Sequence, residues 1–375
     1  MERQKADLKM VAWELTRSCN LSCRHCRASS EFGPYPDELT TIECFRLIDE
    51  IVSFSSPVII LTGGEPLLRE DTFKLAEYGK KQGLRMVMAT NGTLLSEQNT
   101  KQIIASGVKR ISISLDGPDE ASHDGLRGEP GAFKYALGGI QALKNAGMEF
   151  QINSTITKAN LKSLPAIMKL AKGLGAAAHH IFLLVPTGRA KDMQGEELAV
   201  LEYEDTLKFL ARQKKDSSLE IKVTCAPHFN RILLEGNDPA SLGFYQDRRD
   251  ILVPPSKAGK EFPAYPGVSE SPLRGRGCMA GIGFCFVSHI GDLQPCGYLE
   301  IKCGNVRDKG FKNAWTDSEV FNNLRDWSKY KGKCGACEFR SACGGCRARA
   351  YAKYADYLQQ EPYCVYEPKT ALNYV

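Results

Sequence analysis

The feature that most constrains this chain is a regular alternation between short apolar runs and longer amphipathic segments. Strands that alternate with helices of about ten to fifteen residues pair in parallel through right-handed crossovers. Nearly continuous apolar strands indicate that both faces of the sheet are buried. The sequence therefore predicts an α/β fold, a partial (β/α)6 barrel of the TIM type. The six predicted strands are "KMVAWEL", "PVIILT", "LRMVMAT", "KRISISL", "EFQINSTI" and "HHIFLLV".

Polar or glycine-rich loops follow five of these strands. In barrels of this type the chemistry lies at the carboxyl ends of the strands. We therefore expect the functional site at that edge of the sheet. The loops, in chain order, are "TRSC", "GGEPLL", "NGT", "DGPDEASHDGLRG" and "PTGRAKD".

The overall composition excludes several classes of protein. No stretch approaches the roughly eighteen uninterrupted apolar residues of a membrane span, and the charged start "MERQKADLK" lacks the apolar core of a secretory signal. We expect a cytoplasmic protein. The formal net charge of +5 is spread along the chain, without the basic stripe that nucleic-acid binding requires. The sequence predicts no nucleic-acid partner and no membrane partner.

The chain has 14 cysteines, and they are unevenly distributed. A reducing compartment argues against a disulfide framework. Three cysteines lie between residues 19 and 26 and nine lie beyond residue 277, so these two groups are candidate metal ligands. Cys44, in a helical pattern, is interpreted as core filling. Cys225, between the two groups, receives no role.

Cys19, Cys23 and Cys26 form a single loop that is one ligand short of a structural zinc site. His25 could be the fourth ligand, but Cys26 would then have to point the same way from the adjacent backbone position. Three thiolates can instead hold three irons of a [4Fe–4S] cube. The fourth iron would then stay open for a ligand or a reaction.

The spacing C-x3-C-x2-C after the first strand, followed by GGEP after the second, resembles the radical S-adenosylmethionine (SAM) superfamily. The resemblance implies that the open iron chelates the amino and carboxylate groups of SAM. It also implies that the GGEP loop holds the amino group, and that later strand ends contact the ribose or the carboxylate. The residues that the resemblance places around SAM are Gly63, Gly64, Glu65, Pro66, Asn91, Ser114, Arg127 and Asn153.

The cysteine-rich tail resembles the SPASM domain, which carries two auxiliary [4Fe–4S] clusters. That domain's C-x2-C-x5-C-x3-C run occurs here with its last gap shortened to two residues, between Cys343 and Cys346. The strand–helix alternation, a Pro/Gly-rich stretch with "PPSKAGKEFPAYPG" and the cysteine-rich composition beyond it divide the chain into a barrel at 9–215, a connector at 216–276 and a SPASM domain at 277–367. Eight thiolates would suit a pair of zinc knuckles equally well on spacing alone, which is the alternative interpretation.

The resemblance also implies two ligand sets. For the first auxiliary cluster it implies Cys278, Cys296 and Cys346, with Cys285 as the fourth ligand and Cys303 as its competitor. For the second it implies Cys334, Cys337, Cys343 and Cys364.

Almost the whole chain resembles the tetrapyrrole-modifying branch of the SPASM enzymes, and within it the heme b synthases of the siroheme-dependent pathway. The stretches that carry this resemblance include "HIFLLVPTGRAK", "TCAPHFNRI" and "GFCFVSHIGDLQPCGYLEI". It implies oxidative decarboxylation of two propionates of iron-coproporphyrin III to vinyl groups, with an auxiliary cluster accepting an electron. A ferredoxin or flavodoxin would be the electron donor.

Three alternatives stay open. The first is a related tetrapyrrole enzyme, either the didecarboxysiroheme deacetylase or the enzyme of heme d1 precursors. The second is a peptide maturase, although the first strand begins by about residue 9 and leaves no room for a peptide-docking domain. The third is a zinc-ribbon or electron-transfer protein without SAM chemistry.

An anionic porphyrin suggests further candidate residues. Arginine pairs with carboxylates in a strong, bidentate geometry, and histidine could ligate the porphyrin iron. The candidates for substrate contact are Arg189, Arg347, Arg349, His228 and His289.

Overall fold

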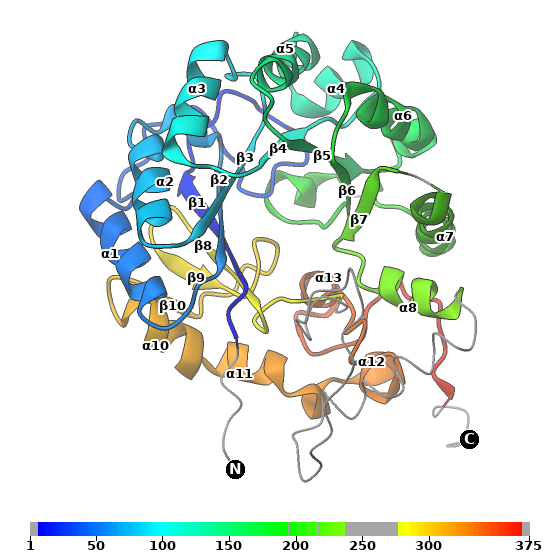
Figure 1. The fold of residues 1–375 in the computed structure, drawn as a ribbon. Helices are drawn as coiled ribbons and strands as arrows, with labels where there is room; N and C mark the ends of the chain where they lie inside the picture. Colours follow the sequence, from blue (N-terminus) through cyan, green and yellow to red (C-terminus); the bar gives the residue numbers. More distant parts are fainter. Residues whose placement is uncertain (1–6, 194, 217, 237–276, 370–375) are drawn as a thin grey trace, which may run out of the picture.

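The computed structural model describes residues 7–193, 195–216, 218–236 and 277–369. Its centre is a ten-stranded sheet in the order β10-β9-β8-β1-β2-β3-β4-β5-β6-β7 (Figure 1). Neighbours from β8 through β1 to β7 are parallel, and β9 and β10 continue the sheet antiparallel. The strands are β1 (Met10–Thr16), β2 (Val58–Gly63), β3 (Arg85–Thr90), β4 (Ile111–Ser114), β5 (Phe150–Ile156), β6 (Ala178–Leu183), β7 (Glu220–Thr224), β8 (Phe284–Val287), β9 (Asp292–Gln294) and β10 (Gly304–Asn305).

Helices cover the outside of this curved sheet, and the C-terminal helices lie below it in Figure 1. The helices of the barrel are α1 (Thr41–Val52), α2 (Thr72–Lys81), α3 (Glu97–Ser106), α4 (Glu120–Arg127), α5 (Ala132–Asn145), α6 (Leu164–Leu174), α7 (Val200–Asp216) and α8 (His228–Glu235). The C-terminal helices are α10 (Gly310–Asp317), α11 (Glu319–Arg325), α12 (Gly332–Ala336) and α13 (Arg347–Tyr354). Short 3₁₀ turns are η1 (Pro66–Leu68), η2 (Leu161–Ser163), η3 (Gly188–Asp192) and η4 (Trp327–Lys329).

The α/β barrel architecture is confirmed, and all six predicted strands are present as β1 to β6. The sheet, however, continues beyond the predicted barrel. β7 pairs in parallel with β6 and α8 follows it, so both elements occupy part of the segment that was expected to be a connector, residues 216–276. β7 spans only five residues and its burial alternates weakly, which explains why its sequence did not suggest a strand. Residues 237–276 lie outside the described part of the chain.

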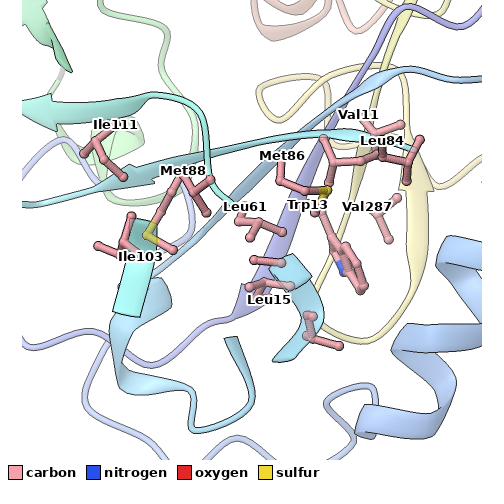
Figure 2. Packing of buried hydrophobic residues seen from close by; sticks show 14 of the residues in the cluster. Val11, Trp13, Leu15, Leu61, Leu84, Met86, Met88, Ile103, Ile111 and Val287 are labelled. Atoms are coloured by element: carbon pink, nitrogen blue, oxygen red, sulfur yellow. The ribbon is translucent and has the colours of Figure 1, made fainter. Parts of the chain in front are cut away.

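The main hydrophobic core lies between the outer face of the sheet and its helices. Val11, Trp13 and Leu15 alternate along β1 and are each at most 1% exposed. Figure 2 shows them packed with side chains from β2, β3 and β8. Fully burying one such side chain contributes about 1.5–3 kcal/mol. Because side chains alternate along a strand, Glu14 faces the opposite, inner side of the barrel.

The C-terminal region is docked on α1 by charged side chains. Thr40 and Glu43 form a capping box at the start of α1. Glu43 also accepts a hydrogen bond from Arg307 Nε at 2.7 Å. At the other end of α1, Glu50 accepts hydrogen bonds from the backbone N–H groups that open α10, with Phe311 N at 2.8 Å. These contacts fix the C-terminal region relative to the barrel. No helix among the described residues is long and apolar enough to cross a membrane.

Candidate active site and cluster-binding sites

The three-cysteine loop follows β1 and gathers its thiols at the carboxyl edge of the sheet. Cys19, Cys23 and Cys26 pack together around Leu21. Cys19 Sγ accepts a hydrogen bond from Leu21 N at 3.4 Å, and Cys26 Sγ accepts one from Ser30 N at 3.3 Å. Burial raises the pKa of Cys19 to about 12, so iron has to displace its proton on binding. Three converging thiols with N–H donors to sulfur fit three ligands of an iron–sulfur cube.

The GGEP loop lies directly against the backbone that enters the cysteine loop. A β-carbon on Gly63 would collide with the carbonyl of Thr16, and one on Gly64 with the carbonyl of Ser18. Gly64 N and Glu65 N instead donate hydrogen bonds to those two carbonyls, both at 2.8 Å. Glycine is therefore required for this close approach, which brings Glu65 next to Cys19.

Glu65 is fully buried and its carboxylate is held by the protein. It accepts hydrogen bonds from Thr90 Oγ1 at 2.8 and 2.9 Å, from Asn91 N at 2.8 Å and from Leu67 N at 3.1 Å. Burial raises its pKa to about 7, and within the described residues no arginine or lysine forms an ion pair with it. A buried carboxylate without a cation fits a positively charged ligand, such as the ammonium group of SAM.

The other predicted SAM contacts lie in a row on neighbouring strands. Asn91 follows β3, and its Nδ2 donates to Asn20 Oδ1 at 2.9 Å and lies 3.9 Å from Cys19 Sγ. Ser114 on β4 is in register with Asn153 on β5, and both are half-buried. The structure thus places these three side chains along the edge that the cluster loop occupies, and their contact with SAM stays a prediction.

Arg127, at the end of α4, belongs to a buried charged group beside the loop. Its Nη2 lies 2.7 Å from Asp116 Oδ2 and its Nη1 lies 3.8 Å from Cys23 Sγ. His25 Nε2 lies 3.3 Å from the same Asp116 oxygen. Burial opposes ionisation of Asp116, but Arg127 and His25 outweigh it and hold its pKa below the usual range. His25 is therefore engaged with a carboxylate, and Arg127 stands next to a cluster ligand.

Arg189 braces the cysteine loop instead of facing open space. Its Nε donates to Cys23 O and its Nη1 to Ser30 O, both at 2.8 Å. Its backbone N–H donates to Cys26 O at 2.9 Å. A β-carbon on the preceding Gly188 would collide with the Cys26 carbonyl. The structure therefore assigns Arg189 to the support of the loop, whereas the sequence suggested substrate contact.

Arg347, the first of the two arginines after Cys346, is also used by the protein itself. It is fully buried and donates to Gln359 O at 2.6 Å, to Tyr357 O at 3.1 Å and to Gly345 O at 3.2 Å. Its Nη2 lies 3.5 Å from the sulfur of Cys334. The structure thus gives Arg347 partners within the protein, and its contact with a propionate stays a prediction.

Arg349 ties the C-terminal region to the barrel. Its Nη1 donates to Cys225 O at 2.7 Å and its Nη2 donates to Leu184 O at 2.9 Å. Its guanidinium also stacks over Tyr203, 5.0 Å from the ring centroid. The side chain is 1% exposed, so Arg349 connects the C-terminal region to the barrel, and its contact with a propionate stays a prediction.

The two candidate histidines lie in different surroundings. His228 is completely buried, stacks on Tyr203 at 4.8 Å and lines a pocket of cysteines, and its contact with the porphyrin iron stays a prediction. His289 lies inside the barrel, where its Nδ1 is 2.7 Å from Glu14 Oε1. Arg27 Nη2 donates to the other oxygen of Glu14 at 2.6 Å. Contact between His289 and substrate stays a prediction.

Cys334, Cys337, Cys343 and Cys364 all line one pocket in the C-terminal region. Cys334 Sγ accepts a hydrogen bond from Glu361 N at 3.3 Å, and Cys343 Sγ accepts one from Gly345 N at 3.4 Å. The structure thus brings together the four thiols predicted for the second auxiliary cluster. Such a donor set fits an iron–sulfur cube.

The shortened gap between Cys343 and Cys346 forms a tight left-handed turn. Gly344 has φ +75° and Gly345 has φ +60°. A β-carbon on Gly345 would lie 2.9 Å from Cys334 Sγ. The turn sends Cys343 into the four-cysteine pocket and Cys346 into a separate cluster of side chains with Cys296. The missing residue therefore does not prevent the two cysteines from serving different sites.

The predicted ligands of the first auxiliary cluster do not all meet. Cys296 and Cys346 pack together. Burial raises the pKa of Cys296, and the thiols of Cys278 and Cys346 raise it further. Cys285 and Cys303 instead lie in the main core, and each of them has Arg325 as a charged neighbour. The structure brings three of the expected thiols together and leaves both candidates for the fourth elsewhere.

The residue after Cys26, Arg27, contacts the segment that carries Cys296. Its Nη1 donates a hydrogen bond to Gly297 O at 3.4 Å, and burial raises the pKa of the neighbouring Tyr298. The Arg27 guanidinium is fixed over the ring of Phe286, 4.4 Å from its centroid. Arg27 therefore connects the three-cysteine loop to the segment that carries Cys296.

Sequence reasoning missed four residues at this site. Glu14 and Arg27 are next to motifs that were recognised, but their pairing is visible only after β1 and the loop fold back on each other. Tyr298 follows Cys296 by two residues, which is a usable signal. The "TCAPH" stretch at Cys225 was noticed as a resemblance, and its cysteine was given no role.

Comparisons with known proteins follow the same division of the chain. The model of the radical SAM superfamily matches residues 13–171, and that of SPASM, an iron-sulfur cluster-binding domain, matches residues 278–344. Together they cover the three-cysteine loop with the GGEP motif and the tail as far as residue 344. They favour iron over zinc in the tail. Among the described residues, no three metal-binding side chains converge closely enough to hold a single metal ion.

Several relatives align over nearly their full length. An "AdoMet-dependent heme synthase" of Nitratidesulfovibrio vulgaris is 46% identical over 361 residues, which cover 96% of this chain and 93% of the relative. A second heme synthase of that name, from Methanosarcina barkeri, is 44% identical, and the alignment covers 96% of this chain and 97% of the relative. An "Fe-coproporphyrin III synthase" of the same organism is 33% identical, and the alignment covers 97% of this chain and 89% of the relative.

Solved structures with the same fold are more distant in sequence. Streptococcus suis SuiB bound to its precursor peptide SuiA superimposes with a TM-score of 0.71 at 14% identity, covering 96% of this chain and 76% of SuiB. At that identity the likeness concerns the fold alone.

Proposed function

The chain belongs to the radical SAM superfamily and carries a SPASM domain, and on that premise we propose that it converts two propionates of iron-coproporphyrin III to vinyl groups, yielding heme b. The observation that carries the proposal is the 46% identity to an AdoMet-dependent heme synthase over 96% of the chain. Identity to the Fe-coproporphyrin III synthase is lower, at 33%. The chain is thus a radical SAM enzyme of heme synthesis, and the proposal concerns which substituent of the tetrapyrrole it modifies.

Bound at Cys19, Cys23 and Cys26, the cluster and SAM would supply the 5′-deoxyadenosyl radical that removes one hydrogen atom from a propionate. The propionate then has to lose CO2 and one electron to become a vinyl group. The chain's own contribution is to hold the reactants in a closed site. Arg189 fixes the loop, and Glu65 offers an unpaired carboxylate to the SAM ammonium group.

The arrangement of the three-cysteine loop and the tail thiols supports a role for an auxiliary cluster as acceptor of the electron that the substrate loses. Arg27 directly follows Cys26, and its Nη1 donates a hydrogen bond at 3.4 Å to the carbonyl of Gly297, the residue after Cys296. A redox centre held by the tail thiols would thus be connected to the three-cysteine loop through Arg27. Protein ligands and hydrogen bonds tune the potentials of such centres. A ferredoxin or flavodoxin is proposed as the donor that reduces the first cluster.

Substrate competition tests this proposal. The reconstituted protein is incubated anaerobically with SAM, dithionite and an equimolar mixture of iron-coproporphyrin III and didecarboxysiroheme, and the products are identified by mass spectrometry. We expect vinyl products from iron-coproporphyrin III and unchanged didecarboxysiroheme. Loss of acetate groups from didecarboxysiroheme would instead assign the chain to the deacetylase. A Soret band that does not shift on titration with either tetrapyrrole would favour a peptide substrate.

A further inference from the structure

We propose that Cys225, outside the region matched by the SPASM model, is the fourth ligand of the first auxiliary cluster. It would complete a set with Cys278, Cys296 and Cys346. The inference concerns the protein's own ligands and does not depend on which tetrapyrrole is the substrate. It replaces Cys285, which the sequence suggested.

Cys225 lies within the same group of side chains as the other thiols. It packs in one cluster with Cys296 and Cys346. Two of the three proposed partners therefore share one packed group with Cys225, and Cys278 follows Gly277, which packs against Pro227, two residues after Cys225.

The backbone around Cys225 is held in place by contacts to the C-terminal region. Its carbonyl accepts hydrogen bonds from Arg349 Nη1 at 2.7 Å and from Tyr203 Oη at 2.8 Å. Arg349 lies three residues after Cys346, so its hydrogen bond to the Cys225 carbonyl connects the segments that carry these two proposed ligands. Gly277, next to Cys278, lies so close to Pro227 that a β-carbon would be only 2.5 Å from the proline Cβ. The segment that carries Cys225 is thus packed directly against the segment that carries Cys278.

The backbone conformation of Cys225 also calls for an explanation. Its φ is +61°, in the left-handed region that residues with a β-carbon rarely adopt. Such a conformation costs about 1–2 kcal/mol. Strained residues of this kind cluster at functional sites, where the surrounding structure holds them. A metal bond to the thiol would offset the cost.

Cys285 faces the other side of the sheet. On β8, its neighbour Phe286 points inward to Arg27, 4.4 Å from the ring centroid. Because side chains alternate along a strand, Cys285 points outward. There it joins the core that contains Trp315, and its charged neighbour is Arg325. A single strand cannot present Phe286 and Cys285 to the same space.

Iron content and spectroscopy test the proposal without measuring turnover. All variants are made in a full-length parent in which Cys19, Cys23 and Cys26 are alanine, so that only the tail clusters bind iron. After anaerobic reconstitution, Cys225→Ala should lose roughly half of the iron, or should show the EPR signal of a three-iron cluster when oxidised. The control Cys285→Ala removes a thiol that is fully buried in the main core and should keep the iron content and the EPR spectrum of the parent.

A conservative variant covers the case in which Cys225→Ala does not fold. Cys225→Ser keeps the size of the side chain and an oxygen ligand, so we expect nearly full iron with an altered EPR spectrum of the reduced cluster. An unchanged spectrum in Cys225→Ser would overturn the proposal. So would full iron in Cys225→Ala, or loss of one cluster in Cys285→Ala or Cys303→Ala.

Discussion

The buried carboxylate of Glu14 allows a quantitative test of how charge is arranged inside the barrel. Glu14 is 2% exposed, and its two oxygens lie 2.6 Å from Arg27 Nη2 and 2.7 Å from His289 Nδ1. Burial alone would raise its pKa, but Arg27 and His289 lower it from 4.5 to about 2. A difference of that size corresponds to about 3 kcal/mol of stabilisation of the folded protein.

Glu14→Gln keeps the shape of the side chain and removes its charge. The variant leaves the guanidinium of Arg27 without its carboxylate, so we expect the free energy of unfolding to fall by about 3 kcal/mol at neutral pH. Because the folded pKa is depressed, this contribution is fully present above the unfolded pKa and is lost as pH falls through the folded one. The difference between wild type and variant should therefore be the same at about pH 7 and at about pH 6.

The assay is urea unfolding of the reconstituted protein, followed anaerobically by circular dichroism. Glu129→Gln, at an exposed position, is the matched control and should change the free energy of unfolding by less than about 0.5 kcal/mol. In the double variant Glu14→Gln, Arg27→Met the loss should be smaller than the sum of the single losses, because the two charges are removed together. Equal effects of Glu14→Gln and Glu129→Gln, or strict additivity in the double variant, would refute the reasoning.

Three further outcomes are expected. Gly345→Ala places a β-carbon 2.9 Å from Cys334 Sγ, so iron should be lost from the four-cysteine pocket; iron analysis that matches the wild type would contradict this. Thr90→Val removes the hydroxyl that donates to both oxygens of Glu65, so the free energy of unfolding should fall by about 1–3 kcal/mol and calorimetry should show weaker SAM binding. Thr90→Ser keeps the hydroxyl and should restore both the stability and the SAM affinity. The pair Cys334→Ala, Cys337→Ala should still form 5′-deoxyadenosine with substrate present but yield little vinyl product; normal vinyl yield from the folded variant would rule out that cluster as an obligatory acceptor.

The sequence predicted the barrel well because its strands are long apolar runs separated by amphipathic helices. β7 was missed because its residues are only partly buried and a Pro/Gly-rich segment follows. The three-cysteine loop was also predictable, since its ligands lie within eight residues of one another and the GGEP loop fits against it by close backbone contact.

The substrate residues were harder to predict, because a sequence shows which side chains are charged but not which groups they bind in the folded protein. Arg347 and Arg349 flank Cys346, which made them candidates for a carboxylate, yet both are buried and donate to backbone carbonyls. Cys285 lies at a suitable spacing from Cys278, but the alternation of β8 turns it outward. Cys225 lies far from the tail in sequence and reaches the other thiols only because β7 extends the sheet.

The central claim is that the radical formed at the three-cysteine loop attacks a propionate side chain. The most direct measurement uses iron-coproporphyrin III deuterated at the propionate β-carbons, incubated anaerobically with the enzyme, SAM and dithionite. We expect deuterium to appear in 5′-deoxyadenosine and heme b to accumulate in the same reaction. 5′-Deoxyadenosine without deuterium, formed while the porphyrin stays intact, would contradict it.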